Sequence, residues 1–199
     1  MKWLSLFLLP LGFVSGETAA LEKCVGADGK VSYSDRPCAA GAKRSSVGGG
    51  SFGEATVEYY DVGGPGPHTA RSDWFLTYRN TTRGVPGGGC EVGEVTTKLD
   101  LKVRMPRWNP PAGADPQTVS NWSRYISALE VHESGHLQHG RDLESNFKRT
   151  AAAIKAASCG EVDRTLRQRF DAMLKDAAAL DVQYDAQTSH GATQGAHYP

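Results

Sequence analysis

The chain has 199 residues, enough for a small leading unit followed by one domain with a sizeable core. Its 22 Lys and Arg residues balance 22 Asp and Glu residues, and no basic cluster stands out. This balance argues against a nucleic-acid partner and against attachment to an anionic membrane surface.

The first 20 residues are typical of a secretory signal peptide. Lys2 provides a short positive region, residues 3–14 form an apolar core, and small residues suited to cleavage follow. The apolar run is too short to span a bilayer, and no later stretch is apolar enough to do so. We therefore expect an exported protein that keeps no transmembrane segment after cleavage of residues 1–20.

The chain contains four cysteines, at positions 24, 38, 90 and 159. An even number is typical of proteins that fold in an oxidising compartment, and four cysteines allow three pairings. We expect Cys24–Cys38 and Cys90–Cys159, because each bond then stays within one structural unit.

Residues 21–40 predict a small β-hairpin unit. Two short strands flank Asp28-Gly29, a dipeptide that favours tight hairpin turns. So few residues cannot bury a core, and we expect the Cys24–Cys38 disulfide to stabilise the hairpin. Residues 41–53 are rich in glycine and serine, which predicts a linker.

The rest of the chain, residues 54–199, predicts strands before helices. Residues 56–62 and 74–78 are rich in β-branched and aromatic side chains. Residues 95–105 alternate apolar and polar side chains, as in a strand with one buried and one solvated face. This alternation favours an antiparallel sheet.

Two long helices are predicted after the strands. The first spans residues 116–157, with Asp115-Pro116 as the N-cap and first position. The second spans residues 163–184, and Cys159-Gly160 predicts the turn between the two helices. An antiparallel sheet followed by two long helices gives an α+β fold.

The first predicted helix carries the pattern H-E-x-x-H at residues 132–136. Residues four apart share one helical face, so His132 and His136 can direct two imidazole nitrogens at one Zn²⁺ ion. Glu133 is turned about 100° from His132 around the helix. Its carboxylate can therefore act as a general base on a water molecule beside the metal. The competing interpretation is an ordinary amphipathic helix with two solvated histidines.

A catalytic zinc site needs a third protein ligand. His139 shares the helical face of the other two histidines, whereas a third ligand should approach from outside that helix. The candidates outside the helix are His190 in the C-terminal tail and three acids, Glu161, Asp181 and Asp185.

Several motifs of this chain occur together in one known family. They are Trp74…Tyr78, Cys90, Met105-Pro106-Arg107-Trp108, Val131-His132-Glu133-Ser134-Gly135-His136, and the ending Tyr184-Asp185…Thr188…His190-Gly191-Ala192-Thr193-Gln194-Gly195-Ala196. With them, residues 54–199 resemble the bacterial domain of unknown function 922, a family of predicted secreted zinc-dependent proteases. Residues 23–38 also resemble a short domain of unknown function that is common at the front of bacterial envelope proteins.

The resemblance implies a zincin-like active site on the first long helix. It matches His190 to a recurrent histidine of the tail, which favours this residue as the third zinc ligand beside His132 and His136. Glu133 then serves as the catalytic base. We expect a periplasmic or secreted zinc metallopeptidase that cleaves a peptide or a cell-envelope amide. The alternative is a non-catalytic envelope binding or scaffold protein whose zinc site is structural or degenerate.

Overall fold

The computed structural model describes residues 22–25, 31–34, 40–41, 43–46 and 52–199. The expected signal peptide and part of the expected linker lie outside these residues. Cys38 also lies outside them, and so therefore does the expected Cys24–Cys38 bond.

Three short strands precede the main domain. Strand β1 (Glu22–Val25) pairs with β2 (Val31–Ser34) as the hairpin expected from the sequence. Strand β3 (Lys43–Ser46), which the sequence did not predict, pairs with the other side of β1. The result is an antiparallel sheet with the order β2-β1-β3.

The main sheet is built around one long hairpin. Strands β5 (Arg71–Gly84) and β6 (Cys90–Arg107) pair antiparallel along most of their length. Strand β4 (Thr56–Asp61) pairs with the other side of β6, and the two-residue β7 (Lys155–Ala156) pairs with its beginning. Contrary to a purely antiparallel expectation, β4 runs parallel to β6.

Both hairpin strands are longer than the sequence predicted. In β5 the even-numbered residues from Ser72 to Thr82 are half-buried or buried, and the odd-numbered ones are exposed. The exposed positions are mostly Arg, Asp and Thr, and of these only Thr is among the residues enriched in strands, so the strand signal is weak outside residues 74–78. One face of the sheet is therefore covered and the other is solvated, as is common in antiparallel sheets.

Two long helices follow the hairpin. Helix α1 (Pro116–Ala151) starts as predicted, because the Asp115 side chain accepts a hydrogen bond from the Thr118 N–H at 2.8 Å. It ends before the predicted residue 157, and the chain then forms β7. Helix α2 (Cys159–Thr188) is longer at both ends than predicted.

The predicted turn at Cys159-Gly160 is wrong. Both residues belong to the first turn of α2, and Ser158 is its N-cap, with a side chain that accepts a hydrogen bond from the Glu161 N–H at 3.3 Å. The glycine that suggested a helix end therefore lies just inside a helix start.

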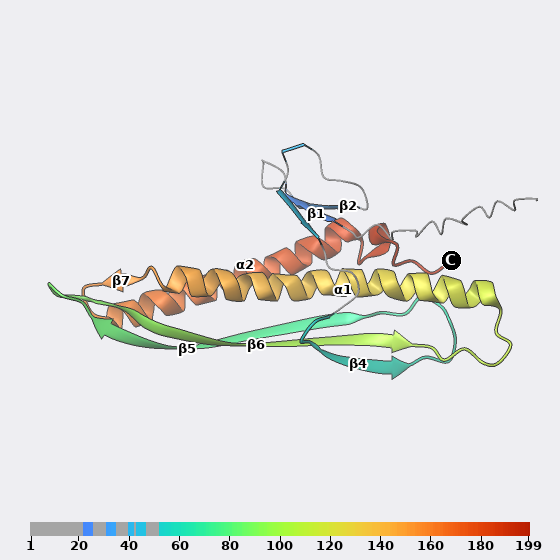
Figure 1. Ribbon diagram of the computed structural model, residues 1–199, viewed down its shortest axis with the longest axis horizontal. Coiled ribbons are helices and arrows are strands. Elements are labelled where there is room, and N and C mark those ends of the chain that lie inside the picture. The colour runs from blue at the N-terminus through green and yellow to red at the C-terminus, as the bar shows by residue number, and fades with distance from the viewer. Residues whose placement is uncertain (1–21, 26–30, 35–39, 42, 47–51) are drawn as a thin grey trace, which may run out of the picture.

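The two helices lie side by side on one face of the sheet (Figure 1). The predicted Cys90–Cys159 disulfide is confirmed and joins the start of β6 to the start of α2. One core cluster, which includes Leu143, Phe147 and Leu166, packs both helices against the hairpin end of the sheet. A second, which includes Met105, Leu129 and Leu137, packs the first half of α1 against β6. The observed architecture is thus α+β, as predicted.

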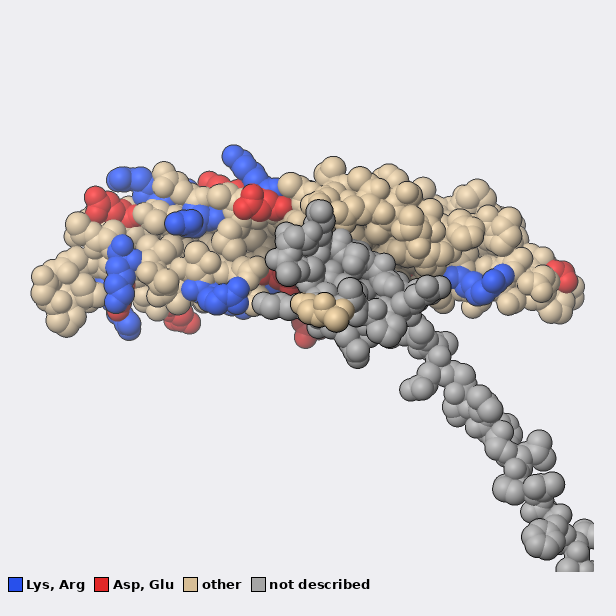
Figure 2. Space-filling view, turned by 90° about the horizontal axis from the view of Figure 1, so that it is seen from above, with Lys and Arg blue, Asp and Glu red and all other residues tan. Residues whose placement is uncertain are grey.

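None of the helices in the described residues is long and apolar enough to cross a membrane. In the view of Figure 2, side chains of both charge signs are intermixed over the end of the molecule that carries β7.

Candidate metal centre

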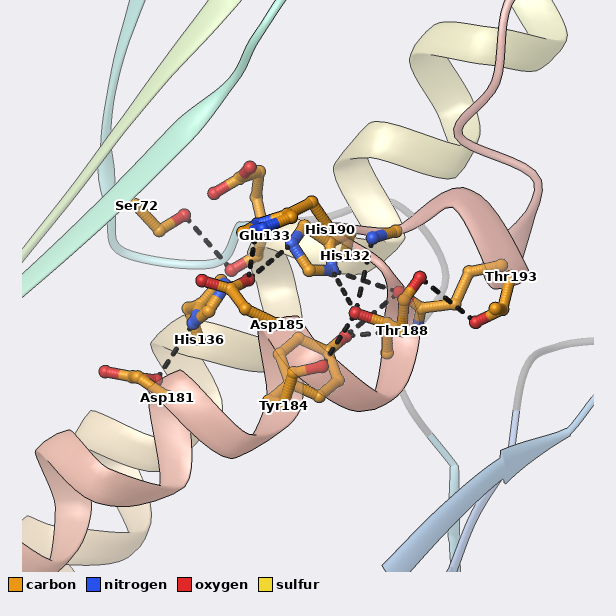
Figure 3. Close-up of polar contacts among 12 residues, drawn as sticks. Ser72, His132, Glu133, His136, Asp181, Tyr184, Asp185, Thr188, His190 and Thr193 are labelled. Carbon is orange, nitrogen blue, oxygen red and sulfur yellow. Dashed lines mark hydrogen bonds and ion pairs between the residues drawn. The ribbon is translucent and has the colours of Figure 1, made fainter.

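The H-E-x-x-H segment lies in the middle of α1 and is buried. His132, Glu133 and His136 are each less than one-tenth exposed. The rings of His132 and His136 lie one helical turn apart, with centroids separated by 4.9 Å. Both rings are directed toward α2 (Figure 3).

The face of α2 opposite these histidines carries Asp181, Tyr184, Asp185 and Thr188, which recur at helical spacing. The Tyr184 ring stacks on His132 with centroids 5.0 Å apart and meets the ring of His136 edge-on. This approach requires a glycine at position 135, because a Cβ atom there would lie 2.3 Å from the Tyr184 hydroxyl. Gly135 therefore lets the two helices come close enough to share a site.

Three side chains converge on one point between the helices. The Asp185 Oδ1 atom lies 3.2 Å from His132 Nε2 and 3.0 Å from His136 Nε2. His132, His136 and Asp185 form one of two groups in the described residues that could hold a metal ion. The other is His136, His139 and Asp181.

The Nδ1 atom of each histidine also lies within hydrogen-bond distance of a side-chain oxygen. His136 Nδ1 lies 2.9 Å from Asp181 Oδ1, and His132 Nδ1 lies 3.0 Å from the amide oxygen of Gln194. Gln194 in turn donates from its amide nitrogen to the Tyr184 hydroxyl at 3.0 Å. Carboxylate or carbonyl acceptors of this kind orient metal-ligating histidines in many proteins.

Asp181 is a shared acceptor in this arrangement. It also lies 2.6 Å from His139 Nδ1 and accepts the Trp74 indole N–H at 2.7 Å. Burial by itself would raise the pKa of Asp181, but its contacts with His136, His139 and Trp74 hold that pKa far below its usual range. Asp181 therefore carries a full negative charge beside His136.

The two histidines differ electrostatically. Burial lowers the pKa of His132, and the neighbouring His136 lowers it further. Burial is also the largest single effect on the pKa of His136 and acts to lower it, but the hydrogen bond and charge of Asp181 together with the charges of Asp185 and Glu133 outweigh burial and leave the pKa raised. The two pKa values shift in opposite directions in part because the Nδ1 atoms have different partners. Nδ1 of His132 faces the neutral amide of Gln194, and Nδ1 of His136 faces the carboxylate of Asp181.

Glu133 is a buried carboxylate without a full set of partners. Its Oε2 atom has no hydrogen-bond partner in the part of the chain that the structure describes. Burial raises the pKa of Glu133. The Ser72 hydroxyl donates to the backbone carbonyl of Glu133 at 3.1 Å and so fixes this residue against the start of β5.

The centre opens into a pocket of about 450 Å³. Its walls come from α1, α2, the start of β5 with the loop before it, and the C-terminal tail. The lining residues are His68, Thr69, Ala70, Arg71, Ser72, Asp73, Tyr125, Leu129, His132, Glu133, His136, Asp181, Asp185, His190 and Ala196. Both histidines and the candidate base therefore face one solvent-accessible space.

The candidates for the third ligand occupy different places. Asp185 belongs to the group that it forms with His132 and His136. Asp181 instead contacts Nδ1 of His136, the ring nitrogen that does not face Asp185. His190 lines the pocket, with its side chain 80% exposed and its Nδ1 atom 3.6 Å from Asp185 Oδ1. Glu161 is exposed in the first turn of α2, about 36 Å along that helix from Asp185, and the fold keeps it away from the site.

The donor set fits a metal cation. A neutral imidazole carries one N–H, and in His132 and His136 both ring nitrogens face an acceptor. If each Nδ1–H is donated outward, two Nε2 lone pairs face the same Asp185 oxygen, an arrangement that a shared cation stabilises. Two imidazoles and one carboxylate are ligands that Zn²⁺ commonly takes.

Sequence reasoning assigned no role to Gln194, Tyr184, Thr188 or Ser72. The spacing from Asp181 to Thr188 shows that Tyr184 and Thr188 share a face of α2 with the two aspartates, which is a usable signal. The contact of Gln194 with His132, by contrast, joins positions 62 residues apart and has no local signature.

Fold and site together define a class: an α+β protein that holds a histidine–aspartate group able to bind a metal between two packed helices. The chain belongs to the family described as bacterial protein of unknown function (DUF922), which matches residues 47–191. Residues 8–51 match a second domain of unknown function (DUF4124). The resemblance seen in the sequence is thereby confirmed. No curated protein and no solved structure matches the chain.

Proposed function

We propose that this protein is an exported zinc-dependent metallopeptidase that hydrolyses a peptide or cell-envelope amide bond. The observation that carries the proposal is the position of Glu133. Its buried carboxylate lies beside two histidines that converge with Asp185, and all four residues line one pocket. An ordinary helix with solvated histidines would not bury them.

In this proposal His132 and His136 hold the ion, with a third ligand from Asp185 or His190. Bound Zn²⁺ would lower the pKa of a water molecule and polarise the carbonyl of the scissile bond. Glu133 accepts the proton of the attacking water and passes it to the leaving nitrogen. The raised pKa of Glu133 suits a group that must both take up and release a proton.

The sheet offers a place for an extended substrate. In the order β4-β6-β5, β5 is an edge strand, and its first residues, Arg71 to Asp73, line the pocket. A peptide laid along this edge would form main-chain hydrogen bonds and place one amide beside Glu133. A cell-envelope crosslink with an amide bond would bind along the same edge of β5.

Export is supported by the signal-like residues 1–20 and by the Cys90–Cys159 disulfide, since disulfides persist in oxidising compartments. The opposing proposal, a scaffold protein with a structural zinc site, requires four protein ligands that close the metal. The pocket beside the three converging side chains favours an accessible centre instead.

The test is cleavage of a peptide library, with cell-wall peptides included, by the purified protein with and without chelator. We expect cleavage that chelation abolishes and Zn²⁺ restores. Glu133→Gln should cut turnover by about 10²-fold or more while zinc content stays near one ion per chain. Glu130→Gln, on the same helix but outside the pocket lining, is the matched control and should leave turnover unchanged. Loss of zinc in Glu133→Gln would contradict the assigned role of base.

A further inference from the structure

We infer that Asp185, and not the tail histidine His190, is the third protein ligand of the metal. The inference rests on the proposed metal site and assigns two roles within it. Asp185 completes a set of two histidines and one aspartate, and His190 remains on the pocket wall, outside that set.

The donor atoms of the three residues lie at nearly the spacing that a zinc ion imposes. Zinc binds imidazole nitrogen and carboxylate oxygen at about 2.0–2.2 Å, so two donors of one tetrahedral ion lie about 3.3 Å apart. Asp185 Oδ1 lies 3.2 Å from one histidine Nε2 and 3.0 Å from the other. These separations are close to the spacing that a shared zinc ion requires, so Asp185 can bind the ion without a large movement.

Two carboxylates on α2 contact different nitrogens of the His136 ring. Asp181 and Asp185 are four residues apart and face the same side of the helix. Asp181 binds Nδ1 of His136, and Asp185 approaches Nε2 of the same ring. In the His136 ring, Nδ1 thus contacts the carboxylate that orients the ring, and Nε2 contacts the carboxylate that we assign as a ligand. Metal-binding histidines in other proteins are oriented in the same way.

Asp185 is held more rigidly than His190. Asp185 is on a helix that Tyr184, 2% exposed, fixes against His132. His190 follows the end of that helix, where Ser189 and His190 both adopt left-handed backbone conformations, with φ of 49° and 52°. A site on a packed helix holds a ligand more precisely than an exposed tail residue does.

Asp185 belongs to the group of side chains that could hold a metal ion, and His190 does not. The donor atoms of His132, His136 and Asp185 all lie within 4.8 Å of one another, and His190 is not a member of this group in the described residues. Its side chain is 80% exposed, compared with 33% for Asp185 and 4% for His132. His190 therefore lies on the exposed wall of the pocket rather than in the group around the proposed ion.

The test measures zinc affinity of the full mature chain by competition with a chromophoric chelator. Asp185→Asn should weaken Zn²⁺ binding by more than about 100-fold, beyond the roughly 10- to 100-fold typical of supporting partners. Asp181→Asn should fall within that supporting range. His190→Ala should leave the affinity unchanged. Thermal melting of each metal-free variant checks that it is folded.

A second measurement does not depend on any variant. X-ray absorption at the zinc edge of the wild-type protein should count two imidazole ligands. Three imidazoles, or a loss of affinity in His190→Ala with none in Asp185→Asn, would overturn the inference while leaving the proposed function intact. A wild-type chain that binds no zinc would refute the proposed function itself.

Discussion

At the scale of single residues, the site depends on contacts that hold both histidine rings in position. His132 is stacked on Tyr184 and bound to Gln194, and His136 is bound to Asp181. Each ring is therefore fixed in orientation before any ion arrives. Pre-orientation of this kind lowers the cost of binding, because little side-chain freedom remains to be lost.

Gly135 allows this packing, and we therefore expect its replacement by alanine to destabilise the protein. Alanine is favoured over glycine within a helix by about 1 kcal/mol, so a gain in stability would follow if space allowed. Here the new Cβ would lie 2.3 Å from the Tyr184 hydroxyl, and Gly135→Ala should instead cost roughly 1–3 kcal/mol. Denaturant unfolding measures the change.

The control for this prediction is Gly160→Ala. Gly160 is also helical, but a Cβ there would meet nothing within 4 Å. This variant should lose no stability. Equal effects at the two positions would mean that close contact with Tyr184 does not decide the cost at Gly135.

At the scale of elements, the site is the place where α1, α2 and the C-terminal tail meet. The tail contains a short 3-10 helix, η1 (Ala192–Gln194), which brings Gln194 to His132. Further on, the Tyr198 ring packs against Trp122 and Tyr125 on α1. The tail therefore supports the centre through residues other than His190.

Truncation after Ser189 should weaken zinc binding by roughly 10- to 100-fold, because it removes the partner of His132. Gln194→Ala alone should reproduce most of the loss, and His190→Ala should reproduce none of it. Competition titration of the three proteins measures the effect. A truncated chain that keeps full affinity would show that Gln194 is dispensable.

The Cys90–Cys159 disulfide acts at the far end of the helices. It closes a loop with a sequence separation of 69 and ties the sheet to the start of α2. Replacing both cysteines with serine should lower the free energy of unfolding by about 2–4 kcal/mol. Urea unfolding gives the value, and wild-type protein under reducing conditions, which would also open the expected Cys24–Cys38 bond, should lose at least as much stability. An unchanged unfolding midpoint would show that the bond adds no stability.

At the scale of the whole molecule, the candidate metal group bridges the two helices. His132 and His136 come from α1 and Asp185 comes from α2, so an ion bound by all three would connect the helices. Such an ion binds the folded chain and not the unfolded one, which links metal concentration to stability.

Zinc should therefore raise the free energy of unfolding by about 2.7 kcal/mol at a free concentration one hundred times its Kd. In a domain of this size each kcal/mol corresponds to a rise in Tm of roughly 2–4 °C. Mg²⁺, which prefers oxygen ligands and octahedral geometry, should give no comparable shift. Calorimetry with each ion measures this, and an unchanged Tm at saturating zinc would exclude a metal shared by the helices.

The sequence by itself determined the features that depend on local spacing. The four-residue interval between His132 and His136, the Asp115-Pro116 helix start and the period-two alternation of β6 each follow from backbone geometry that a few residues define. The order of strands and helices likewise predicted the α+β class. The Cys90–Cys159 pair followed from keeping each bond within one unit.

Only the tertiary structure decided which distant side chains complete the centre. The spacing on α2 places Asp181 and Asp185 on one face but does not say which carboxylate meets Nε2 of His136. That depends on the distance between the helices, which Tyr184 and Gly135 set by packing. The parallel pairing of β4 and the contact of Gln194 with His132 are decided in the same way, by residues far apart in the chain.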